Sequence, residues 1–351
     1  MQKGKALIAM SGGVDSSVTA YLMQEAGYDC IGATMKLIEK AGAQTDADEA
    51  RTVADRLGMD FHVFDFTALF KEQVIDPFVR CYECGLTPNP CVDCNRHLKF
   101  QALYDRARLL GCDCIATGHY ASIRFDGAAG RWLLYKAADR TKDQSYFLYT
   151  LSQEQLSHTL FPLGGLTKEA VRDIAAGQGF LNARKRDSQD ICFIPDGKYM
   201  DFLTAYNHKT YAPGNFLDMD GKVIGTHQGA VAYTRGQRKG LGLAMGAPVY
   251  VYSKDMEQNS VTVCENDALF SRVLRADDWN FFPFDTLTAP IRVCAKTRSR
   301  MAEQPAAVYP EENGTIRVEF DEPQRAITTG QAVVLYDGDQ VIGGGTITEV
   351  L

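Results

Sequence analysis

The first third of the chain alternates short apolar runs with segments of helical periodicity, and this alternation constrains the fold more than any other feature. The run Ala6–Met10 is typical of a buried strand, and a helix is expected after the glycine turn that follows it. Further strands are expected at Cys30–Met35, Phe61–Phe64 and Cys114–Thr117, with helices between them. This order predicts an α/β domain with a doubly wound parallel sheet, covered by helices on both faces.

Beyond about residue 200 the pattern changes to short strands separated by frequent glycines. Val333–Tyr336 and Gln340–Ile342 flank Asp337-Gly338-Asp339, a sequence typical of a β-hairpin. We therefore expect three domains: the parallel-sheet domain over residues 1–200, a small central β-rich domain over 201–275 and a C-terminal β-barrel over 276–351.

Composition excludes several classes of protein. No stretch approaches the roughly 20 apolar residues of a membrane helix, and the first residues meet a glycine turn too early for a signal peptide. The 37 basic and 44 acidic residues give a net charge of −7, which argues against a protein that coats nucleic acid indiscriminately. We expect a cytoplasmic protein that does not contact membranes.

The strongest motif is the loop Ser11–Ser16 (SGGVDS), placed between a strand and a helix. Two glycines let the backbone approach a phosphate, and the helix N-terminus offers unpaired amides. Met35 ends one expected strand and Gly118 follows another, at the carboxyl edge of the sheet where ligands of such sheets bind. A carboxylate at Asp15 would repel phosphates unless it binds Mg²⁺ or caps the helix. The alternative is an ordinary strand-to-helix turn.

Cysteines form the second motif. Cys81/Cys84 and Cys91/Cys94 are two Cys-x-x-Cys pairs, and Cys192 lies far along the chain. Three interpretations stay open: a small zinc site, structurally inert thiols, or sulfur or iron–sulfur cluster chemistry. The cations Arg96, His97 and Lys99 follow Cys94 and would lower the pKa of its thiol if the fold holds them close to it.

Four motifs together resemble one family. They are AMSGGVDSS (9–17), GLTPNPCVDCNRHLKF (85–100), ATGHYA with KDQSYFLY (116–121 and 142–149) and DSQDICFIPDG (187–197). The chain resembles the tRNA-specific 2-thiouridylase (MnmA/TrmU) family, within the PP-loop ATP pyrophosphatases, over nearly its full length. The resemblance implies that ATP adenylates O2 of the wobble uridine of tRNA and that sulfur then displaces AMP. A base stacked in the anticodon loop must first be flipped out.

The resemblance also implies roles for individual residues. Cys192 would carry a persulfide, Cys94 would be its catalytic partner in a transient disulfide, and Asp15 would be catalytic. The ATP-binding residues would be Ala9, Met10, Ser11, Gly12, Gly13, Val14, Asp15, Ser16, Met35 and Gly118. The residues that contact tRNA would be Asn89, Pro90 and Cys91 at the target base, and His119, Lys142, Asp143, Gln144, Arg298, Ser299 and Gln331 elsewhere. Basic clusters at Arg184-Lys185-Arg186 and Arg235-Arg238-Lys239 are expected to hold phosphates.

The implied cofactors are ATP and Mg²⁺, and the implied partners are tRNA and a sulfur donor protein, either a cysteine desulfurase or a relay protein. One departure leaves the mechanism open, because many family members have an acidic residue at the position of Cys91. Cys91, Cys94 and Cys192 would together suit a [4Fe-4S] cluster with one open iron site. A cluster-bound sulfide is therefore the alternative to the persulfide.

Two other functions compete with this one. Another PP-loop ligase or amidotransferase would use ammonia as nucleophile and would need no thiols. A zinc-stabilised RNA-binding protein would hold zinc on the two Cys-x-x-Cys pairs and would release no pyrophosphate.

Overall fold

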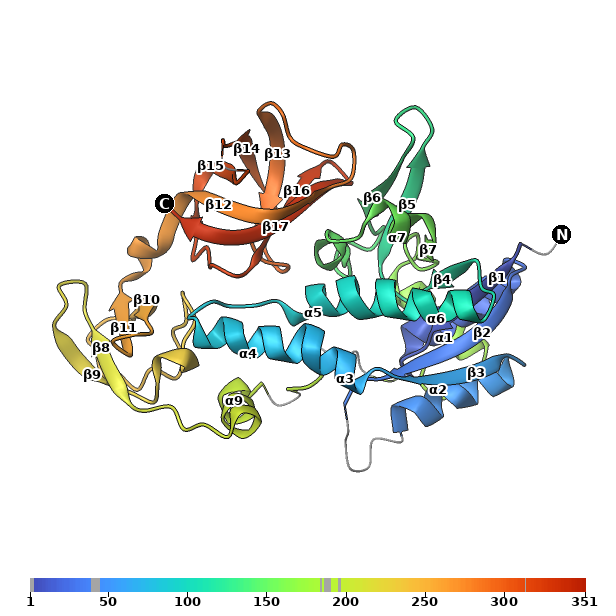
Figure 1. Cartoon of the computed structure of the whole chain (residues 1–351), viewed down its shortest axis with the longest axis horizontal. Coiled ribbons are helices and arrows are strands. Elements are labelled where there is room, and N and C mark those ends of the chain that lie inside the picture. Colours follow the sequence, from blue (N-terminus) through green and yellow to red (C-terminus); the bar gives the residue numbers. More distant parts are fainter. Residues whose placement is uncertain (1–2, 39–44, 184, 186–190, 195–196, 313) are drawn as a thin grey trace.

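The computed structural model of the chain describes residues 3–38, 45–183, 185, 191–194, 197–312 and 314–351 (Figure 1). Its N-terminal part contains a parallel five-stranded sheet in the order β3-β2-β1-β4-β7. The strands are β1 (Lys5–Ala9), β2 (Asp29–Lys36), β3 (Asp60–Asp65), β4 (Cys114–Ala116) and β7 (Thr159–Leu160). The expected doubly wound α/β domain is confirmed, and every strand expected in it is present.

Helices cover both faces of this sheet because alternate residues of its strands are buried on opposite sides. In β1, Ala6 and Ile8 pack on one face with α1, α2 and α8, whereas Leu7 packs on the other with α4 and α6. The helices are α1 (Val14–Glu25), α2 (Thr45–Arg56), α3 (Thr67–Phe70), η1 (Lys71–Ile75), α4 (Asp76–Glu83), α5 (Pro90–Asp93), η2 (Cys94–Ala102), α6 (Leu103–Leu109), α7 (Gln153–Ser157), α8 (Lys168–Gly177) and α9 (Tyr199–Asn207).

The helix expected between the strands Phe61–Phe64 and Cys114–Thr117 is composed of three segments. It begins with α5 at Pro90, continues as the π-helix η2 from Cys94, and ends as α6. A second π-helix, η1, joins α3 to α4. Wide helical turns of this kind are rare and are frequent at functional sites. Here one of them begins at a candidate catalytic cysteine.

The remaining strands form a four-stranded sheet and a closed barrel. The sheet has the order β10-β11-β8-β9, from β8 (Gly214–Leu217), β9 (Val223–His227), β10 (Tyr250–Asp255) and β11 (Ser260–Cys264). The barrel closes through pairing of its first and last strands, β12 and β17. Its strands are β12 (Phe270–Phe281), β13 (Ile291–Lys296), β14 (Gln304–Pro310), β15 (Ile316–Arg325), β16 (Ala332–Asp337) and β17 (Gln340–Val350). The expected central β-rich part and C-terminal barrel are both confirmed.

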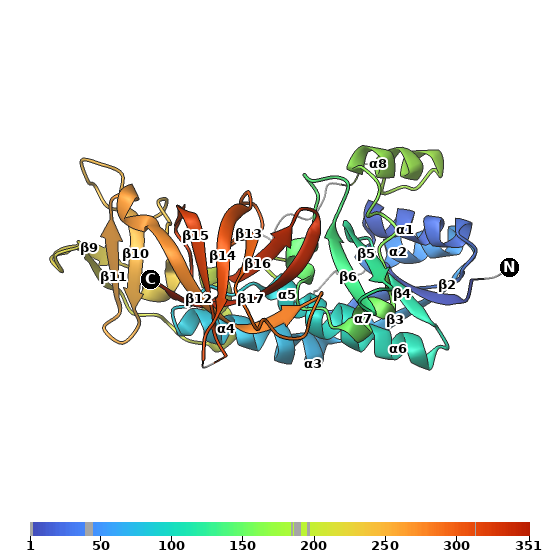
Figure 2. The same ribbon diagram turned by 90° about the horizontal axis from the view of Figure 1, so that it is seen from above.

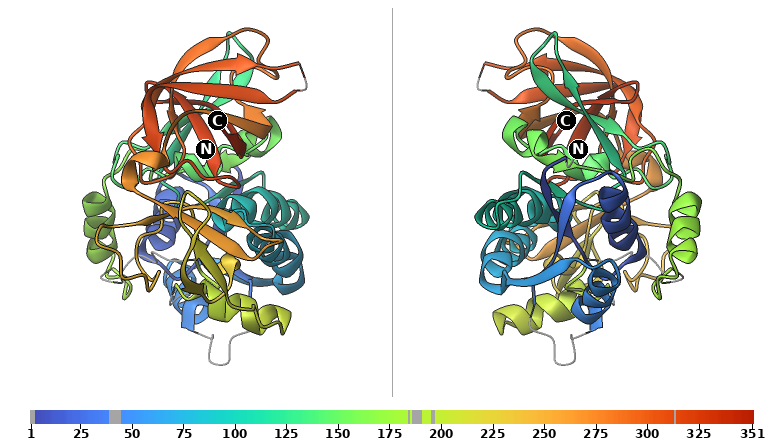
Figure 3. Two further views of the ribbon diagram at one scale, coloured as in Figure 1. Left: turned by 90° about the vertical axis from the view of Figure 1, so that its left-hand side faces the viewer. Right: turned by 90° about the vertical axis from the view of Figure 1, so that its right-hand side faces the viewer.

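One hairpin was not expected from the sequence. β5 (Ala121–Asp126) and β6 (Arg131–Lys136) leave the parallel-sheet part, and β6 pairs with β17 of the barrel. The barrel therefore lies above the parallel-sheet part, as both end views show (Figure 3). Seen from above, the four-stranded sheet lies at the far end from β1–β3, beyond the barrel (Figure 2). Among the described residues no helix is long and apolar enough to cross a membrane.

Candidate active site

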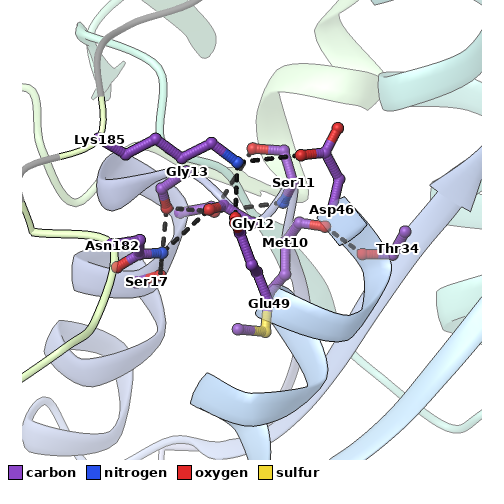
Figure 4. Close-up of polar contacts among 11 residues, drawn as sticks. Met10, Ser11, Gly12, Gly13, Ser17, Thr34, Asp46, Glu49, Asn182 and Lys185 are labelled. Atoms are coloured by element: carbon purple, nitrogen blue, oxygen red, sulfur yellow. Dashed lines mark hydrogen bonds and ion pairs between the residues drawn. The ribbon is translucent and has the colours of Figure 1, made fainter. Parts of the chain in front are cut away.

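The loop after β1 is folded as a compact turn at the N-terminus of α1 (Figure 4). Gly12 has a φ of +72°, and a Cβ built there would lie 2.6 Å from the carbonyl oxygen of Asp46, so only glycine fits. The Ser11 amide donates to the Ser16 hydroxyl at 3.2 Å, and that hydroxyl donates to the Gly13 carbonyl at 2.9 Å. These hydrogen bonds fix the conformation of the turn, so that the amides of the first turn of α1 and the serine hydroxyls lie close to one another.

The other predicted nucleotide-binding residues surround this turn. Ala9 ends β1 and Met10 follows it, Met35 lies near the end of β2, and the Thr34 hydroxyl donates to the Met10 carbonyl. Gly118 follows β4 and lies against α1: a Cβ there would be 2.9 Å from the carbonyl carbon of Asp15. The structure thus brings the predicted ATP-binding residues together at the carboxyl edge of the sheet.

Asp15 does not cap α1, contrary to one of the two roles expected from the sequence. Gly13 is the N-cap and has no side-chain cap, and the Asp15 carboxylate accepts two bonds of 2.8 Å from the Lys168 ammonium instead. The Tyr120 hydroxyl also donates to Asp15, at 2.8 Å. Both carboxylate oxygens are therefore engaged by the protein, which does not fit a ready-made Mg²⁺ site on Asp15 in this state.

The predicted basic cluster around Lys185 is engaged with acidic groups. The Lys185 ammonium lies 2.9 Å from Asp46 and 2.5 Å from Glu49, both on α2 beside the glycine turn. Arg184 and Arg186 lie outside the described residues. Lys185 therefore lies at the rim of the predicted nucleotide site.

The segment that contains Cys91 and Cys94 consists of a loop followed by the short helix α5. Pro90 opens α5, and Cys91 is exposed whereas Cys94, at the first turn of η2, is buried. The Asn95 amide on η2 donates to the Phe147 carbonyl at 2.9 Å, which fixes the helix against the segment containing Lys142–Gln144. Cys94 is thus held in the interior, with Cys91 one turn earlier at the surface.

Cys192 lies near this helix although it is distant in sequence. Its neighbour Phe193 is buried, with ring centroids 5.6 Å from Phe70 and 5.2 Å from Phe78. Cys192 itself is exposed, and it lies close enough to Cys94 to raise the pKa of the Cys94 thiol. The fold therefore brings together the two cysteines predicted to act together. Residues 187–190, 195 and 196 of the same motif lie outside the described residues.

Lys99 lowers the thiol pKa of Cys94 as expected, but the net shift is upward. Burial raises the pKa of Cys94 to about 11, and the opposing effect of the Lys99 ammonium does not compensate for it. Although Cys91 is exposed as a residue, the protein packed around its sulfur removes water from it and raises the pKa of that thiol as well. Asp93 lies between the two, and burial raises the pKa of its own carboxyl to about 6. The thiols are uncharged at neutral pH until the surroundings change.

Within the ranges that the structure describes, no group of three or more His, Cys, Asp or Glu residues is arranged to hold a metal ion. All ten cysteines are free thiols, so Cys94 and Cys192 are not joined by a disulfide in this state. Cys81 is half-buried and Cys84 exposed at the end of α4. The zinc interpretation of these cysteines and the cluster on Cys91, Cys94 and Cys192 therefore both require a different arrangement of side chains.

The residues predicted to contact tRNA differ in their exposure. His119 is buried between the rings of Phe100 and Phe161, and burial lowers its pKa well below the usual value, so it is neutral. Asp143 accepts from the Ala137 amide and the Ser145 hydroxyl, and Gln144 accepts from the Tyr120 amide at 3.0 Å. The side chains of His119, Asp143 and Gln144 therefore make contacts inside the protein.

The remaining predicted contacts lie on the barrel. The Gln331 amide donates to the carbonyls of Thr87 and Pro88, at 2.9 and 3.2 Å, and so holds the loop before Asn89. Arg298 donates to the Ala326 carbonyl at 3.0 Å and to the Thr328 hydroxyl at 2.8 Å, and Ser299 follows it in a turn. The barrel therefore reaches the cysteine loop directly.

Sequence reasoning missed three residues that support the site, one after β4, one at the start of α8 and one beyond α8. Lys168, Tyr120 and Asn182 contact the glycine turn, Asn182 by donating to the Gly12 carbonyl at 3.0 Å and to the Ser17 hydroxyl at 2.9 Å. Nothing in the sequence around Lys168 indicates that this lysine, the first residue of α8, contacts the glycine turn. The sequence could have predicted only the position of Lys168 at a helix N-terminus, because Thr167 is a typical N-cap residue.

Fold and site together define a three-domain protein with a nucleotide-binding HUP domain. Models described as the tRNA methyl transferase HUP domain, the tRNA methyl transferase PRC-barrel domain and the aminomethyltransferase beta-barrel domain match residues 4–196, 200–265 and 271–347. The chain is 47% identical to the tRNA-specific 2-thiouridylase MnmA of Clostridioides difficile, over 99% of both chains. It is 49% identical to that of Moorella thermoacetica, over 98% of this chain and 99% of that protein. The chain belongs to the MnmA tRNA-specific 2-thiouridylase family, which confirms the resemblance drawn from its motifs.

Two solved structures match the chain distantly. A 4-thiouridine synthetase in complex with RNA and ATP is 17% identical with a TM-score of 0.36, covering 57% of this chain and 50% of that one. The U34-tRNA thiolase NcsA of Methanococcus maripaludis, with its [4Fe-4S] cluster, is 19% identical with a TM-score of 0.36, covering 58% and 67%.

Proposed function

We propose that this protein is a tRNA-uridine 2-sulfurtransferase, which uses ATP to replace O2 of the wobble uridine by sulfur. The observation that carries the proposal is the short connection between the glycine turn and the cysteine helix, in a chain of the MnmA family. Gly118 lies against α1, and the next residue, His119, has its ring 5.5 Å from Phe100 on η2. A base held between these elements would meet both ATP and thiols.

The first step is adenylation. O2 of the flipped uridine attacks the α-phosphorus of ATP, the bond to the bridging oxygen breaks, and pyrophosphate leaves with its electron pair. O2 then carries AMP and becomes a good leaving group. The serine–glycine turn and the N-terminus of α1 would hold the phosphates, while Met35 and Gly118 would contact the rest of the nucleotide.

The second step transfers sulfur. The terminal sulfur of a persulfide on Cys192 attacks C2, and AMP leaves. The Cys94 thiolate then attacks the Cys192 sulfur, which frees the thiocarbonyl and forms a Cys94–Cys192 disulfide that an external thiol must reduce. Exposed Cys192 suits loading by a sulfur donor protein, and buried Cys94 suits a reaction shielded from water.

A [4Fe-4S] cluster on Cys91, Cys94 and Cys192 is the alternative sulfur carrier. The thiols lie in one region, yet the described side chains are not arranged to hold a metal, so we derive no step through a cluster. Anaerobic purification with iron and sulfide quantitation distinguishes the two carriers. Iron that is present in the wild type and absent in Cys91→Ser would favour the cluster.

Basic groups on the seam between the barrel and the four-stranded sheet support binding of tRNA phosphates. Arg235, Arg298 and Arg325 lie close together. Arg298 donates to the Arg235 carbonyl at 3.3 Å, and its pKa is lowered by burial and by the nearby positive charge of Arg325. Arg235 and Arg325 stack on Tyr252 and Tyr250. Among the described residues none of the three forms an ion pair with a carboxylate. Such unneutralised cations favour a polyanion and predict salt-sensitive binding.

The test is incubation with unmodified tRNA, ATP, Mg²⁺ and a sulfide or persulfide source, followed by mass analysis of nucleosides. The expected product is uridine in which one oxygen is exchanged for sulfur, formed together with AMP and pyrophosphate. Cys94→Ala and Cys192→Ala should each abolish the product, whereas Cys264→Ala, a buried thiol of β11, should retain it. Activity that survives the loss of both Cys94 and Cys192 would favour the ammonia-using ligase.

The zinc-stabilised RNA-binding protein remains the rival from another class. It predicts stoichiometric zinc and no release of pyrophosphate with tRNA. The proposed function places the protein in the cytoplasm, because its substrates tRNA and ATP meet there. The Cys94–Cys192 disulfide would be a transient state of the cycle.

A further inference from the structure

Cys192 lies at the corner of a tight turn. The Ile194 amide donates to the Ile191 carbonyl at 2.8 Å, which closes a turn with Cys192 and Phe193 at its two central positions. Cys192 is exposed, whereas Phe193 is buried. Because the two side chains leave adjacent positions of one closed turn, the packing of Phe193 determines where the Cys192 sulfur lies.

Three aromatic rings from three different helices contact Phe193. Its ring centroid lies 5.6 Å from that of Phe70 at the end of α3, 5.2 Å from that of Phe78 on α4 and 5.1 Å from that of Phe202 on α9. Phe70 and Phe78 are fully buried and meet Phe193 edge to face, an arrangement that aromatic pairs prefer. We call the rings of Phe70, Phe78 and Phe202 the aromatic socket.

The π-helix η1 aligns two rings of the socket. Phe78 follows Phe70 by eight positions, which in a regular α-helix of about 3.6 residues per turn would rotate the two side chains apart by roughly 80°. In η1 the Asp76 amide donates to the Lys71 carbonyl, five positions earlier instead of four, so the wide turn takes up one residue. The two rings are then separated by about two whole turns, and both reach Phe193. The wide turn is therefore part of the support for the turn that carries the cysteine.

Each of the two cysteines predicted to react is followed by a buried residue that fixes it. Asn95 follows Cys94, is 2% exposed and donates to the Phe147 carbonyl at 2.9 Å. Phe193 follows Cys192 and is held in the aromatic socket. The two thiols lie close enough for a charge on Cys192 to affect Cys94. Sulfur can pass between them only if both are held in place, because a bond between two sulfurs requires a separation of about 2 Å and a narrow range of directions.

We propose that Phe193 is a positioning residue for sulfur transfer, whose ring in the aromatic socket keeps the Cys192 sulfur within reach of Cys94. Phe193 acts through Cys192, because a phenyl ring supplies neither a charge nor a transferable proton. Attack on C2 of the uridine and disulfide formation with Cys94 use sulfur held at the same residue, so its position matters in both steps. The inference rests on the proposed function where it concerns thiolation, whereas the proximity of the two thiols is a property of the free protein.

The first test measures the reach of Cys192 without tRNA or ATP. The full-length protein is treated with diamide, which takes up two electrons and two protons as the Cys94–Cys192 disulfide forms from two thiols, and peptide mass analysis follows the disulfide over time. Phe193→Ala and Phe193→Leu are compared with the wild type. Phe216→Ala is the matched control, because it removes a fully buried ring of β8 that also makes two edge-to-face contacts, in the four-stranded sheet.

We expect Phe193→Ala to form the disulfide about 10-fold or more slowly than the wild type, because the turn loses its anchor. Phe193→Leu keeps an apolar side chain in the socket and should be slowed by about 3-fold. Labelling of Cys192 by iodoacetamide should not be slowed in either variant, since this thiol is exposed. Phe216→Ala should form the disulfide within about 2-fold of the wild-type rate, although the lost ring lowers its Tm.

Wild-type rates of disulfide formation in both Phe193 variants would overturn the proposal, and so would an equal slowing in Phe216→Ala. If Phe193→Ala does not fold, Phe193→Leu decides alone.

The second test separates sulfur transfer from adenylation. With tRNA, ATP, Mg²⁺ and a persulfide source, Phe193→Ala should release pyrophosphate within about 3-fold of the wild-type rate but form thiouridine about 10-fold or more slowly, with an unchanged KM for tRNA. Parallel losses of pyrophosphate release and of thiolation would indicate a general structural defect and contradict a positioning role. A wild-type protein that releases no pyrophosphate with tRNA would refute the proposed function, and the diamide comparison would still decide the role of Phe193.

Discussion

Cys94 shows how burial controls a reactive group in the empty site. Its thiol is expected to be protonated at neutral pH, because burial raises its pKa to about 11 and Lys99 lowers it by less. A protonated thiol neither attacks a neighbouring sulfur nor becomes oxidised readily. We infer that tRNA binding must change these surroundings before sulfur transfer, which restricts thiolate formation to the complex.

The first prediction follows from this pKa. The rate at which iodoacetamide labels Cys94 in the tRNA-free protein should still rise between pH 9 and pH 10, because the thiol pKa is about 11. Lys99→Met should raise that pKa further and slow the labelling at a given pH. Peptide mass analysis reads out each site, with exposed Cys84 as the accessible reference. A Cys94 rate that levels off below pH 9 would contradict the prediction.

Lys254 on β10 gives the second prediction. Its ammonium nitrogen is buried without a hydrogen-bond partner among the described residues, and burial lowers its pKa to about 8. The unfolded chain binds this proton up to the ordinary value of 10.5, so stability rises with pH between about 8 and 10.5, and the full penalty is present below pH 8.

Lys254→Met should therefore raise the free energy of unfolding at pH 7 by about 1–3 kcal/mol, a gain that shrinks toward pH 10. Urea unfolding at the two pH values measures it. Lys222→Met, an exposed lysine of the same sheet region, should change stability by less than about 0.5 kcal/mol. A loss of stability in Lys254→Met at pH 7 would mean that the ammonium has a partner.

At the scale of elements, the sequence predicted those features that depend on a few neighbouring residues. The turn at Gly12 and Gly13 and the strands before and after it could be read from the chain, because glycine conformation and apolar periodicity act over a few residues. The contacts of Asp15 with Lys168 could not, because they join residues 153 positions apart. The net shift in the thiol pKa of Cys94 could not be predicted for the same reason, since burial comes from tertiary packing that its neighbours in sequence do not reveal.

The loop before the cysteines gives the third prediction, at this scale. A Cβ at Gly330, which has a φ of +85°, would lie 2.9 Å from the Thr87 amide nitrogen, and Gln331 donates to two carbonyls of the same loop. The barrel turn therefore determines where Asn89 and Cys91 lie. Gln331→Ala should slow uridine thiolation by about 10-fold or more, because reacting groups are sensitive to displacements near 1 Å.

Gly330→Ala should have a larger effect, because it displaces the loop and strains its own backbone. Neither variant should change ATP affinity, which is measured in parallel by titration. Gln324→Ala serves as the control, since its amide donates to the Glu322 carbonyl within β15 and not to the loop. An equal loss of thiolation in Gln324→Ala would show that the effect is general destabilisation of the barrel.

At the scale of the whole molecule, the barrel and the parallel-sheet part are joined by strand pairing. β6 pairs with β17 through Leu134 and Tyr135, so the hairpin that follows His119 is a part of the barrel sheet. The division of the chain into domains at residues 200 and 275 stays a prediction. The hairpin belongs to the first of these domains by sequence, but it pairs with a strand of the third. Movement of the barrel on tRNA binding would therefore be transmitted to the Gly118–His119 turn.

Lys136 at the end of β6 gives the final prediction. Its side chain is 8% exposed, and its ammonium lies 2.6 Å from both oxygens of Glu303 and 2.7 Å from the Gly338 carbonyl. Removing one partner of such a pair leaves a poorly solvated charge, so Lys136→Met should lower the free energy of unfolding by about 3 kcal/mol. Calorimetry should also show the barrel unfolding at a lower temperature than the parallel-sheet part, because a largely buried ion pair that joins them is lost.

Arg140 provides the matched control at the same junction. It pairs with Asp339 at 2.5 Å, but the two side chains are 48% and 65% exposed. Water and salt screen that pair, so Arg140→Met should cost less than about 1 kcal/mol and should leave a single transition. If both variants lost the same stability, burial of Lys136 would not be what joins the two parts. If only Lys136→Met also slowed thiolation, the barrel would be positioning the cysteine loop through this hairpin.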